Sequence, residues 1–405
     1  MASEIRELLA AHGKPAREVY LDNENSGWVP REVVEEMIPY FNERGYGHPS
    51  ITNKPGWEAL EVIAETNELV ARTIAGNPIG VNFVHGGTEA NNLAILGTVK
   101  AKKSKGKKIV VSDIEHYSVL LPALSLEDVG LTVIRAPVDE EGFIDIDVLP
   151  ELVDKETILV SIQAVNHEIG TIQRLKEIVE VAKDKNPDVI FHTDACDAYG
   201  RVELNVRDLE IDLLSLSSHK VLGPKGVGVL YIKEGVRVEP ILKGALSSQH
   251  LWPGVENVPA IAGFKKAIEL AFEGFHEHNQ KIASMRDYLM NSILESVPDT
   301  KLNGPRGRER VSDNVNISFL HVEGEALTVE LSMRGVYVSS GSACTSRVLE
   351  PSHVMLAIGR EYEEAHGSIL FKLTRYHELD DMRYVVEQVI GAVERLRKLS
   401  PLGKG

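Results

Sequence analysis

The sequence predicts an α/β protein in which a mostly parallel sheet is followed by a smaller α+β region. Between residues 81 and 232, short runs of β-branched and other apolar residues alternate with stretches of helical periodicity. The runs are almost continuously apolar, which is typical of parallel strands covered by helices on both faces. The predicted strands span residues 81–84, 108–111, 131–135, 157–162, 189–192, 211–216 and 227–232.

The pattern changes after about Gly263, where a long helical stretch leads into mixed segments and a final helix. We therefore expect a large domain over residues 29–262 and a small α+β domain formed by residues 1–28 and 263–405. The expected helices are 90–103, 175–185, 260–297 and 380–399, and the mixed segments of the small domain are 314–320, 327–334, 336–340 and 369–373.

Composition excludes several classes of protein. The chain of 405 residues has a formal net charge of −16, which repels phosphate backbones, so we expect no general nucleic-acid binding. The basic run at 100–108 is a local patch or, as we favour, a solvated helix end. No apolar run approaches the roughly 20 residues that cross a bilayer, and the first residues have no signal-peptide core. Two cysteines cannot form a disulfide scaffold, so we expect a cytoplasmic protein.

Polar or glycine-rich segments follow five of the predicted strands, at the point where each strand ends. Ligands of open α/β sheets bind beyond the carboxyl ends of the strands, and parallel strands bring these ends to one edge. We therefore expect one shared site at this edge. The segments are residues 85–89, 112–116, 163–168, 194 and 217–220.

Four of these segments have the residue types of a pyridoxal-phosphate site. Gly87 and Thr88 open a helix, where free N–H groups and a hydroxyl form a phosphate cradle; a simple N-cap by Thr88 is the alternative. Lys220, at a strand end before a Gly-Pro turn, has the position of a lysine that forms a Schiff base with this cofactor, and a surface lysine in a turn is the alternative. Asp194 would pair with the pyridinium nitrogen, and His116 would cover the ring. Their coincidence favours the cofactor site.

The two cysteines have different surroundings. Cys344 lies in a run of small and hydroxyl residues, 339–346, which can present a reactive thiolate to a substrate. Cys196 is expected to be structural. The His-Glu-His cluster at 276–278 is half of a metal site without a third ligand, so we expect a solvated helix face and no metal.

These residues together resemble the cysteine desulfurases, NifS-like members of the class V aminotransferases and thus fold-type I pyridoxal-phosphate enzymes. The resemblance extends from about residue 19 to residue 393. It implies a fold-type I PLP-dependent transferase with a large cofactor-binding domain, a small domain that carries Cys344, and a homodimer. The segments that carry the resemblance are 20–22, 87–92, 115–116, 165–170, 192–195, 217–220 with 223–226, and 340–344.

The resemblance implies a role for each residue singled out above. Lys220 would attach pyridoxal 5′-phosphate, His116 would stack on its ring and help in proton transfer, and Asp194 would keep the pyridine nitrogen protonated. Cys344 would attack the sulfur of bound L-cysteine, which gives L-alanine and an enzyme persulfide. The implied phosphate ligands are Gly87, Thr88, Ser217 and His219.

We therefore predict a cysteine desulfurase whose persulfide serves a sulfur-acceptor protein, such as an iron–sulfur scaffold, in iron–sulfur cluster assembly or thiolation. The alternatives are a related lyase or aminotransferase that acts on another amino acid, and a non-catalytic sulfur-transfer partner that retained the fold.

Four positions differ from the pattern of the family. His167 and Asp197 stand where an asparagine and a glutamine usually face the phenolic oxygen of the cofactor. Val255 replaces a threonine that would reach the phosphate across the dimer interface. Leu370 replaces the arginine that would hold the substrate carboxylate. These departures leave attachment of the cofactor in place and bear on substrate choice and turnover.

Asn166 and Lys372 are the residues that we predict to bind the substrate. In a strand over 369–373, Lys372 shares a face with Leu370 and lies about 7 Å farther along, so we expect its ammonium to replace the missing arginine, with weaker orientation. Arg375 is the rival, but it is an odd number of positions from Leu370. A solvated edge position is the alternative for Lys372.

Overall fold

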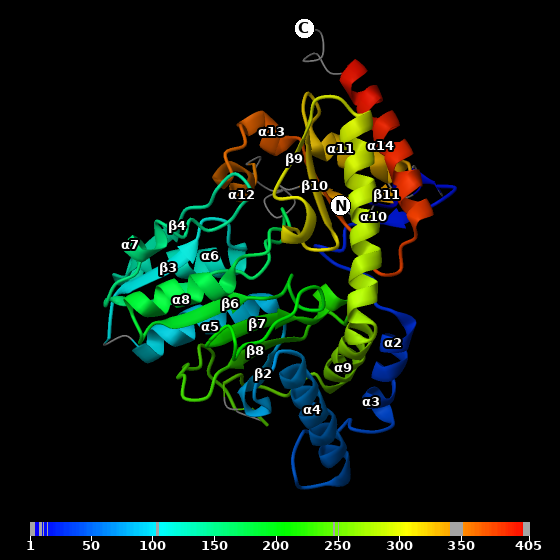
Figure 1. Ribbon diagram of the computed structural model, residues 1–405. Helices are drawn as coiled ribbons and strands as arrows, with labels where there is room; N and C mark the ends of the chain where they lie inside the picture. The colour runs from blue at the N-terminus through cyan, green and yellow to red at the C-terminus, as the bar shows by residue number, and fades with distance from the viewer. Residues whose placement is uncertain are drawn as a thin grey trace. The chain divides into compact units, whose positions relative to one another are not determined.

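The computed structural model of the protein has two compact units, the large unit and the small unit (Figure 1). The boundary expected after residue 262 falls inside a helix of the large unit, α9 (Val258–Phe272). The large unit contains residues 27–167 and 171–275, and the small unit contains residues 1–26, 168–170 and 276–405. The structure describes residues 5–7, 10, 12–13, 15–102, 105–245, 248–249, 251–340 and 351–399.

Within the described residues, the large unit contains a seven-stranded sheet in the order β2-β8-β7-β6-β5-β3-β4. β8 is antiparallel to both neighbours, and the other strands run in one direction. The predicted mostly parallel sheet is thus confirmed. The strands are β2 (Val81–Val84), β3 (Lys108–Ser112), β4 (Thr132–Ala136), β5 (Thr157–Ser161), β6 (Ile190–Asp194), β7 (Leu213–Ser217) and β8 (Gly228–Ile232).

Helices cover both faces of this sheet because the connections run in opposite directions along it. The chain passes from β2 to β3 and from β3 to β4 toward one edge, and from β4 through β5 to β6 in the reverse sense. Right-handed crossovers therefore place α5 and α6 on one face and α7 and α8 on the other, and Figure 1 shows α8 in front of the strands and α5 behind them. The helices are α2 (Arg31–Met37), α3 (Pro39–Asn42), α4 (Lys54–Thr73), α5 (Gly87–Lys102), α6 (Tyr117–Leu124), α7 (Leu149–Leu152), α8 (Leu175–Lys185) and α9.

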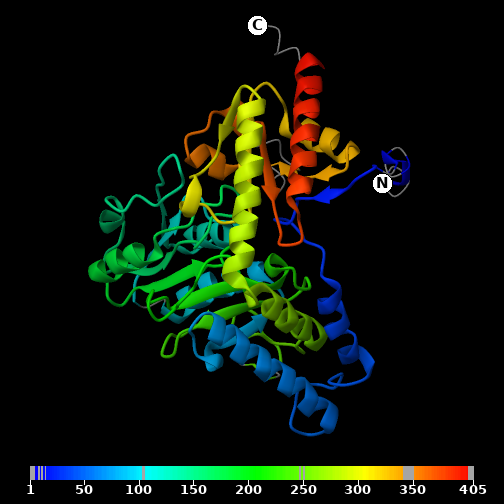
Figure 2. The ribbon, with the colours of Figure 1, turned by 45° about the vertical axis from the view of Figure 1, so that its right-hand side comes forward.

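The core of the large unit lies between the sheet and these helices. Leu93 of α5 and Val119 of α6 pack with alternate residues of the strands, among them Ile109 and Leu159. This alternation is expected because successive side chains of a strand point to opposite faces. Farther along the chain, α9 lies beside α4 (Figure 2). The sheet is therefore held from both sides, so its strand ends are rigid supports for side chains.

The small unit has an antiparallel sheet, which in the described part of the chain has the order β12-β13-β10-β9, and a parallel pair, β1 with β11. Phe319 and Phe371 are fully buried in its core. The strands are β1 (Val19–Tyr20), β9 (Thr300–Leu302), β10 (Asn314–Phe319), β11 (Val336–Tyr337), β12 (Ser339–Ser340) and β13 (Ser368–Lys372), and the helices are α10 (Phe275–Ser296), α11 (Gly324–Met333), α12 (His353–Ala357), α13 (Tyr362–His366) and α14 (Leu379–Leu399).

The single long helical stretch expected over 260–297 is wrong, because two helices occupy it. α9 ends at Phe272, and α10 begins at Phe275. Gly274 between them has a φ of 60°, a left-handed conformation that ends helices and that glycine adopts without strain. Apolar residues with helical spacing continue on both sides, so the periodicity alone does not reveal the break.

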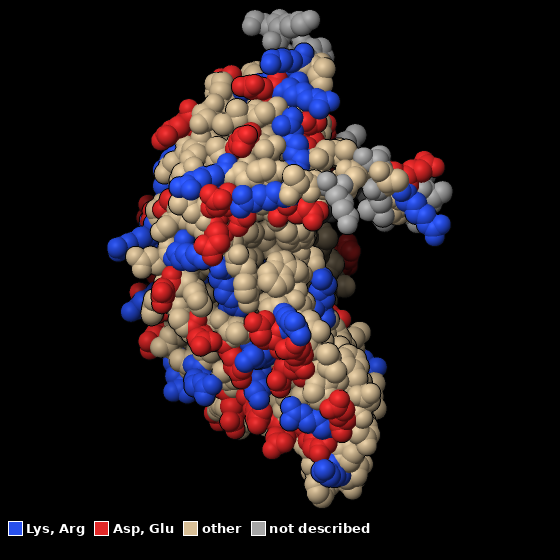
Figure 3. All heavy atoms as spheres, turned by 90° about the vertical axis from the view of Figure 1, so that its right-hand side faces the viewer, with Lys and Arg blue, Asp and Glu red and all other residues tan. Residues whose placement is uncertain are grey.

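The structure gives information on two classes of protein considered from composition, membrane proteins and nucleic-acid binders. Across the residues that the structure describes, no helix has both the length and the apolar character needed to cross a membrane. On the face shown in Figure 3, basic and acidic side chains are interspersed over most of the surface. The cytoplasmic location stays a prediction.

Candidate functional site

The predicted site residues of the large unit come from loops at one edge of the sheet. β2, β3, β5, β6 and β7 run in the same direction, so their carboxyl ends meet at this edge. The glycine-rich and polar segments of the sequence follow these five strands. The tertiary structure therefore brings together side chains that lie far apart in the chain.

Gly87, the first residue of α5, approaches two neighbouring loops closely. A Cβ at this position would lie 2.8 Å from Cys196 Sγ and 3.3 Å from the Cβ of Ser217. Only glycine therefore lets the start of α5 lie against the ends of β6 and β7. Thr88 is exposed and lies inside the first turn of the helix, so it is not the N-cap. The exposed N–H groups at this helix start can receive an anion.

Lys220 follows β7 in a short 3₁₀ helix, Ser218–Val221, and its ammonium meets a carboxylate. Nζ of Lys220 lies 3.0 Å from Oδ2 of Asp197, and the two side chains are 10% and 6% exposed. Beside this ion pair, Ser217 Oγ lies 2.9 Å from Nδ1 of His219. Burial lowers the pKa of His219 to about 4, so this ring is neutral near pH 7. The alternative of a surface lysine in a turn does not fit Lys220.

A chain of hydrogen bonds joins His116 to Asp194. The amide of Asn91 in α5 donates to Asp194 Oδ2 at 2.7 Å and to Ser118 Oγ at 2.8 Å. That hydroxyl lies 2.6 Å from His116 Nδ1, which also accepts the N–H of Ser118 at 3.0 Å. Nδ1 is therefore an acceptor, and in the neutral ring the proton sits on Nε2. Asp194 Oδ1 accepts the N–H of Cys196 at 3.0 Å, so both carboxylate oxygens have donors.

His116 and His167 lie edge to face, with their ring centroids 5.0 Å apart. Burial, reinforced by the neighbouring His167, lowers the pKa of His116 to about 4. A neutral imidazole near pH 7 can both accept and donate a proton, which a permanently charged group cannot do. The side chain of His116 is only partly buried, so one face of the site stays accessible to a ligand.

The loop after β5 is held against the loop after β3. Gln163 Nε2 and Asn166 Nδ2 both donate to the carbonyl of Ile114, at 2.7 and 3.0 Å. Glu115 accepts the N–H of Gln163 at 2.8 Å, and its complete burial raises the pKa of its carboxyl to about 8. Glu115 therefore carries a proton near pH 7. The contact of Asn166 with substrate stays a prediction.

Of the two cysteines, Cys196 lies within the part of the chain that the structure describes. Cys196 is buried against the start of α5, and burial raises the pKa of its thiol well above the ordinary value. A thiol that stays protonated is a poor nucleophile, in agreement with the structural role expected for Cys196. Cys344 lies outside the described residues. Ser352, which follows that segment, donates to Glu168 Oε2 at 2.6 Å within the small unit.

Some residues of this network were not assigned a role from the sequence. Asn91 and Ser118 join the histidine to the aspartate, and Glu168 holds the residue at the start of α12. The sequence could have indicated Asn91, because an amide side chain among the apolar residues of α5 needs a hydrogen-bond partner when it is buried. No local pattern indicates Ser118, since a serine after a histidine also fits an ordinary helix start.

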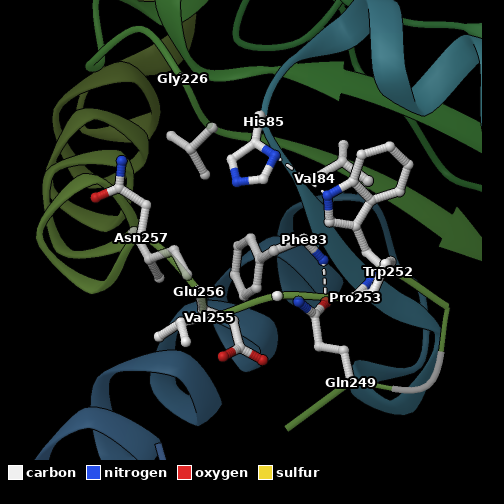
Figure 4. A pocket seen from close by; sticks show the side chains of 13 residues that line it. Phe83, Val84, His85, Gly226, Gln249, Trp252, Pro253, Val255, Glu256 and Asn257 are labelled. Carbon is white, nitrogen blue, oxygen red and sulfur yellow. Dashed lines mark hydrogen bonds between the residues drawn. The ribbon is translucent and has the colours of Figure 1, made fainter. Parts of the chain in front are cut away.

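A shallow pocket lies beside the start of α5 (Figure 4). Trp252 Nε1 lies 3.1 Å from His85 Nδ1, and the side-chain oxygen of Gln249 accepts the N–H of Phe83 on the edge strand β2. Val255 lines the pocket and is 60% exposed. The resemblance places the segment around Val255 at a subunit interface. In this unit, Trp252 and Gln249 hold that segment against His85 and β2, close to the start of α5.

Lys372, in the small unit, is fully buried in β13, which lies between β12 and β10. Its Nζ lies 3.2 Å from Glu24 Oε2 and 3.7 Å from Asp313 Oδ1. The alternative of a solvated edge position is therefore wrong. The contact of Lys372 with the substrate carboxylate stays a prediction, and its ammonium already faces two carboxylates here.

No group of three potential metal-ligating side chains occurs in the described ranges. His276 and Glu277 lie in the first turn of α10 with exposed side chains. His278 is half-buried, so the expected solvated helix face holds for His276 and Glu277.

Comparisons with known proteins agree with this arrangement. The family model Aminotransferase class-V matches residues 19–385. "Cysteine desulfurase IscS" of Dictyoglomus turgidum is 42% identical, with 95% of this chain and 97% of the relative covered. "Cysteine desulfurase IscS 1" of Archaeoglobus fulgidus is 40% identical, with 95% and 99% covered. Among solved structures, a "NIFS-LIKE PROTEIN" has a TM-score of 0.87 at 30% identity, with 94% of this chain and all of the other covered. "SspA in complex with cysteine" has a TM-score of 0.78 at 30% identity, with 89% and 100% covered.

The buried ion pair of Lys372 predicts a large loss of stability in Lys372→Met. Removal of one partner leaves buried carboxylates without a counter-charge, which costs about 3–5 kcal/mol. Denaturant unfolding measures this loss. Lys281→Met is the matched control, since Lys281 pairs with Glu378 on the surface of the same unit at 2.7 Å, and such a pair contributes about 0–1 kcal/mol. Equal losses in the two variants would contradict the prediction.

Proposed function

Because the chain belongs to the class-V aminotransferase family, we propose that it is a cysteine desulfurase whose site at the strand ends binds pyridoxal 5′-phosphate. The overall reaction joins L-cysteine and an enzyme thiol to give L-alanine and an enzyme persulfide, so that all atoms balance. The observation that carries the proposal is the convergence of the Gly87 cradle, the buried Asp194 and the buried Lys220 at one edge of the sheet. The name of the relatives and the cysteine complex of one structural neighbour favour cysteine as the substrate.

The residues present fit this cofactor. A phosphate would bind at the start of α5, where a Cβ at Gly87 would collide with Cys196, together with Thr88, Ser217 and His219. Asp194 would hold the protonated ring nitrogen, because it is a buried carboxylate at a strand end whose position is fixed by Asn91 and by the N–H of Cys196. Lys220 would supply the covalent link. When bound, the cofactor supplies an electron sink for the amino-acid substrate.

The chain's own groups supply proton transfer and orientation. The hydrogen-bonded chain through Ser118 and Asn91 holds the ring of His116 in one tautomer, with the proton on Nε2. The neutral imidazole is thus able to move a proton at Nε2. We propose that Cys344 is the thiol that takes the sulfur and that the persulfide passes to a sulfur-acceptor protein such as an iron–sulfur scaffold.

One assay separates the candidate functions. The purified chain is incubated with L-cysteine, and alanine and sulfide are measured. Both products form in a desulfurase. Cofactor binding without these products would indicate a related lyase or aminotransferase for another amino acid, and a chain that binds no cofactor would indicate a non-catalytic sulfur-transfer partner.

We further propose a homodimer that uses an apolar surface of the large unit. Phe41 and Trp57 are 65% and 55% exposed, and large apolar side chains that gather on one part of a surface mark a protein-interaction site. The surface lies on α2, α3, the segment that leads into α4 and the first turn of α4. Its members are Val34, Ile38, Phe41, Tyr46, Ile51 and Trp57.

Lys220→Ala should abolish the visible absorbance of bound cofactor while the protein stays folded. The lysine supplies the covalent link, whereas the buried strands of the sheet do not depend on its side chain. Absorbance spectroscopy and circular dichroism measure the two properties. A cofactor adduct that borohydride still fixes in Lys220→Ala would show that another lysine carries the link.

Cys344→Ser should bind the cofactor and cysteine but form no persulfide, because a hydroxyl is far less nucleophilic than a thiolate. Cys196→Ser is the matched control and should retain persulfide formation. Mass spectrometry of the protein after reaction with cysteine detects the added sulfur. Loss of the persulfide in Cys196→Ser alone would move the nucleophile to Cys196.

Phe41→Glu should shift the protein from dimer to monomer, since a charge buried in an interface without a partner is unfavourable. Light scattering after size-exclusion chromatography measures the mass. Val129→Glu is the control, because Val129 is also exposed, at 68%, and is not part of the apolar surface. A dimer that persists in both Phe41→Glu and Trp57→Glu would exclude this surface as the interface.

A further inference from the structure

Asp197 forms a buried ion pair with Lys220. The two atoms Nζ and Oδ2 lie 3.0 Å apart, and both side chains are at least nine-tenths buried. The glutamine usual at this position in the family is an uncharged amide, which neither balances an ammonium charge nor accepts a proton near neutral pH. A glutamine at this position would form no ion pair with Lys220.

The other titratable groups around Lys220 do not replace this carboxylate. His116 and His219 have pKa values lowered to about 4 by burial, so both rings are neutral near pH 7. The raised pKa of Cys196 keeps its thiol protonated. Asp194 is a second carboxylate of the site, but its oxygens accept from Asn91 and from the N–H of Cys196.

Two further groups approach this ion pair from neighbouring residues. Arg201 donates through Nη2 to the carbonyl of Lys220 at 2.8 Å, so it holds the backbone and leaves the ammonium to the carboxylate. His167 contacts His116 edge to face, with the ring centroids 5.0 Å apart. Asp197 is in direct contact with Nζ.

We propose that Asp197 holds Lys220 as an ammonium ion and accepts the proton that Nζ releases before it bonds to a carbonyl carbon. The proposal rests on the role of Lys220 in the proposed function. An ammonium has no lone pair, so Nζ must lose a proton to react. Transfer of that proton to Asp197 converts the ion pair into a neutral amine and a neutral carboxylic acid, so that no unpaired charge is left buried.

The test measures how the reactivity of Lys220 depends on pH. The chain, freed of cofactor by treatment with hydroxylamine followed by dialysis, is treated with formaldehyde and cyanoborohydride at a series of pH values. The Nζ lone pair bonds to the formaldehyde carbon, the oxygen leaves as water, and hydride from cyanoborohydride reduces the carbon–nitrogen bond. Peptide mass spectrometry then gives the pH of half-methylation for Lys220 and, as an internal reference, for the exposed Lys225.

We expect Asp197→Asn to lower the pH of half-methylation of Lys220 by about one to three units, because loss of a neighbouring negative charge favours the neutral amine. Lys225 should not change, and Asp197→Glu should restore the wild-type profile. A merely structural role of Asp197 would not shift the profile of Lys220 relative to Lys225.

Asp197→Gln, which carries the residue usual in the family, serves as a second variant if Asp197→Asn does not fold. An unchanged profile of Lys220 in the folded variant would overturn the proposal. The readout uses neither cofactor nor cysteine. A shifted profile in a chain that releases no sulfide from cysteine would therefore overturn the proposed function and leave in place the role of Asp197 in holding Lys220 as an ammonium ion.

Discussion

The common direction of β2, β3, β5, β6 and β7 is the constraint on which the site depends. Parallel strands end at one edge, so each loop that follows them adds a side chain to the same small volume. The sheet is covered by helices on both faces, and its strands are therefore fixed. Gly87 completes the arrangement, because the start of α5 reaches the ends of β6 and β7 only without a Cβ.

Burial determines the charges within this edge of the sheet. It keeps His116 and His219 neutral near pH 7 and leaves a proton on Glu115 and on the thiol of Cys196. The ammonium of Lys220 then faces a carboxylate, as buried charges must. Each of these groups therefore has one favoured protonation state near pH 7. This suits a reaction in which side chains accept and donate single protons.

In the small unit, too, buried charged and polar groups face partners. Lys372 is buried with Glu24 and Asp313, and Glu168 accepts the hydroxyl of Ser352 at the start of α12. These polar contacts are costly to bury unless every member is paired. They therefore specify one packing of β13 and of the segment before α12.

The sequence by itself determined the strands of the large unit, the polar segments that follow them, and the types of residue at the site, because periodicity and turn residues are local properties. Gly87, His116, Asp194 and Lys220 could be named from their positions after strands. Only the tertiary structure decided which partners they have. The ion pair of Lys220 with Asp197 and the chain from His116 to Asp194 depend on which strands are neighbours. The burial of Lys372 has the same origin, since hydrophobic spacing along one strand does not show what packs against it.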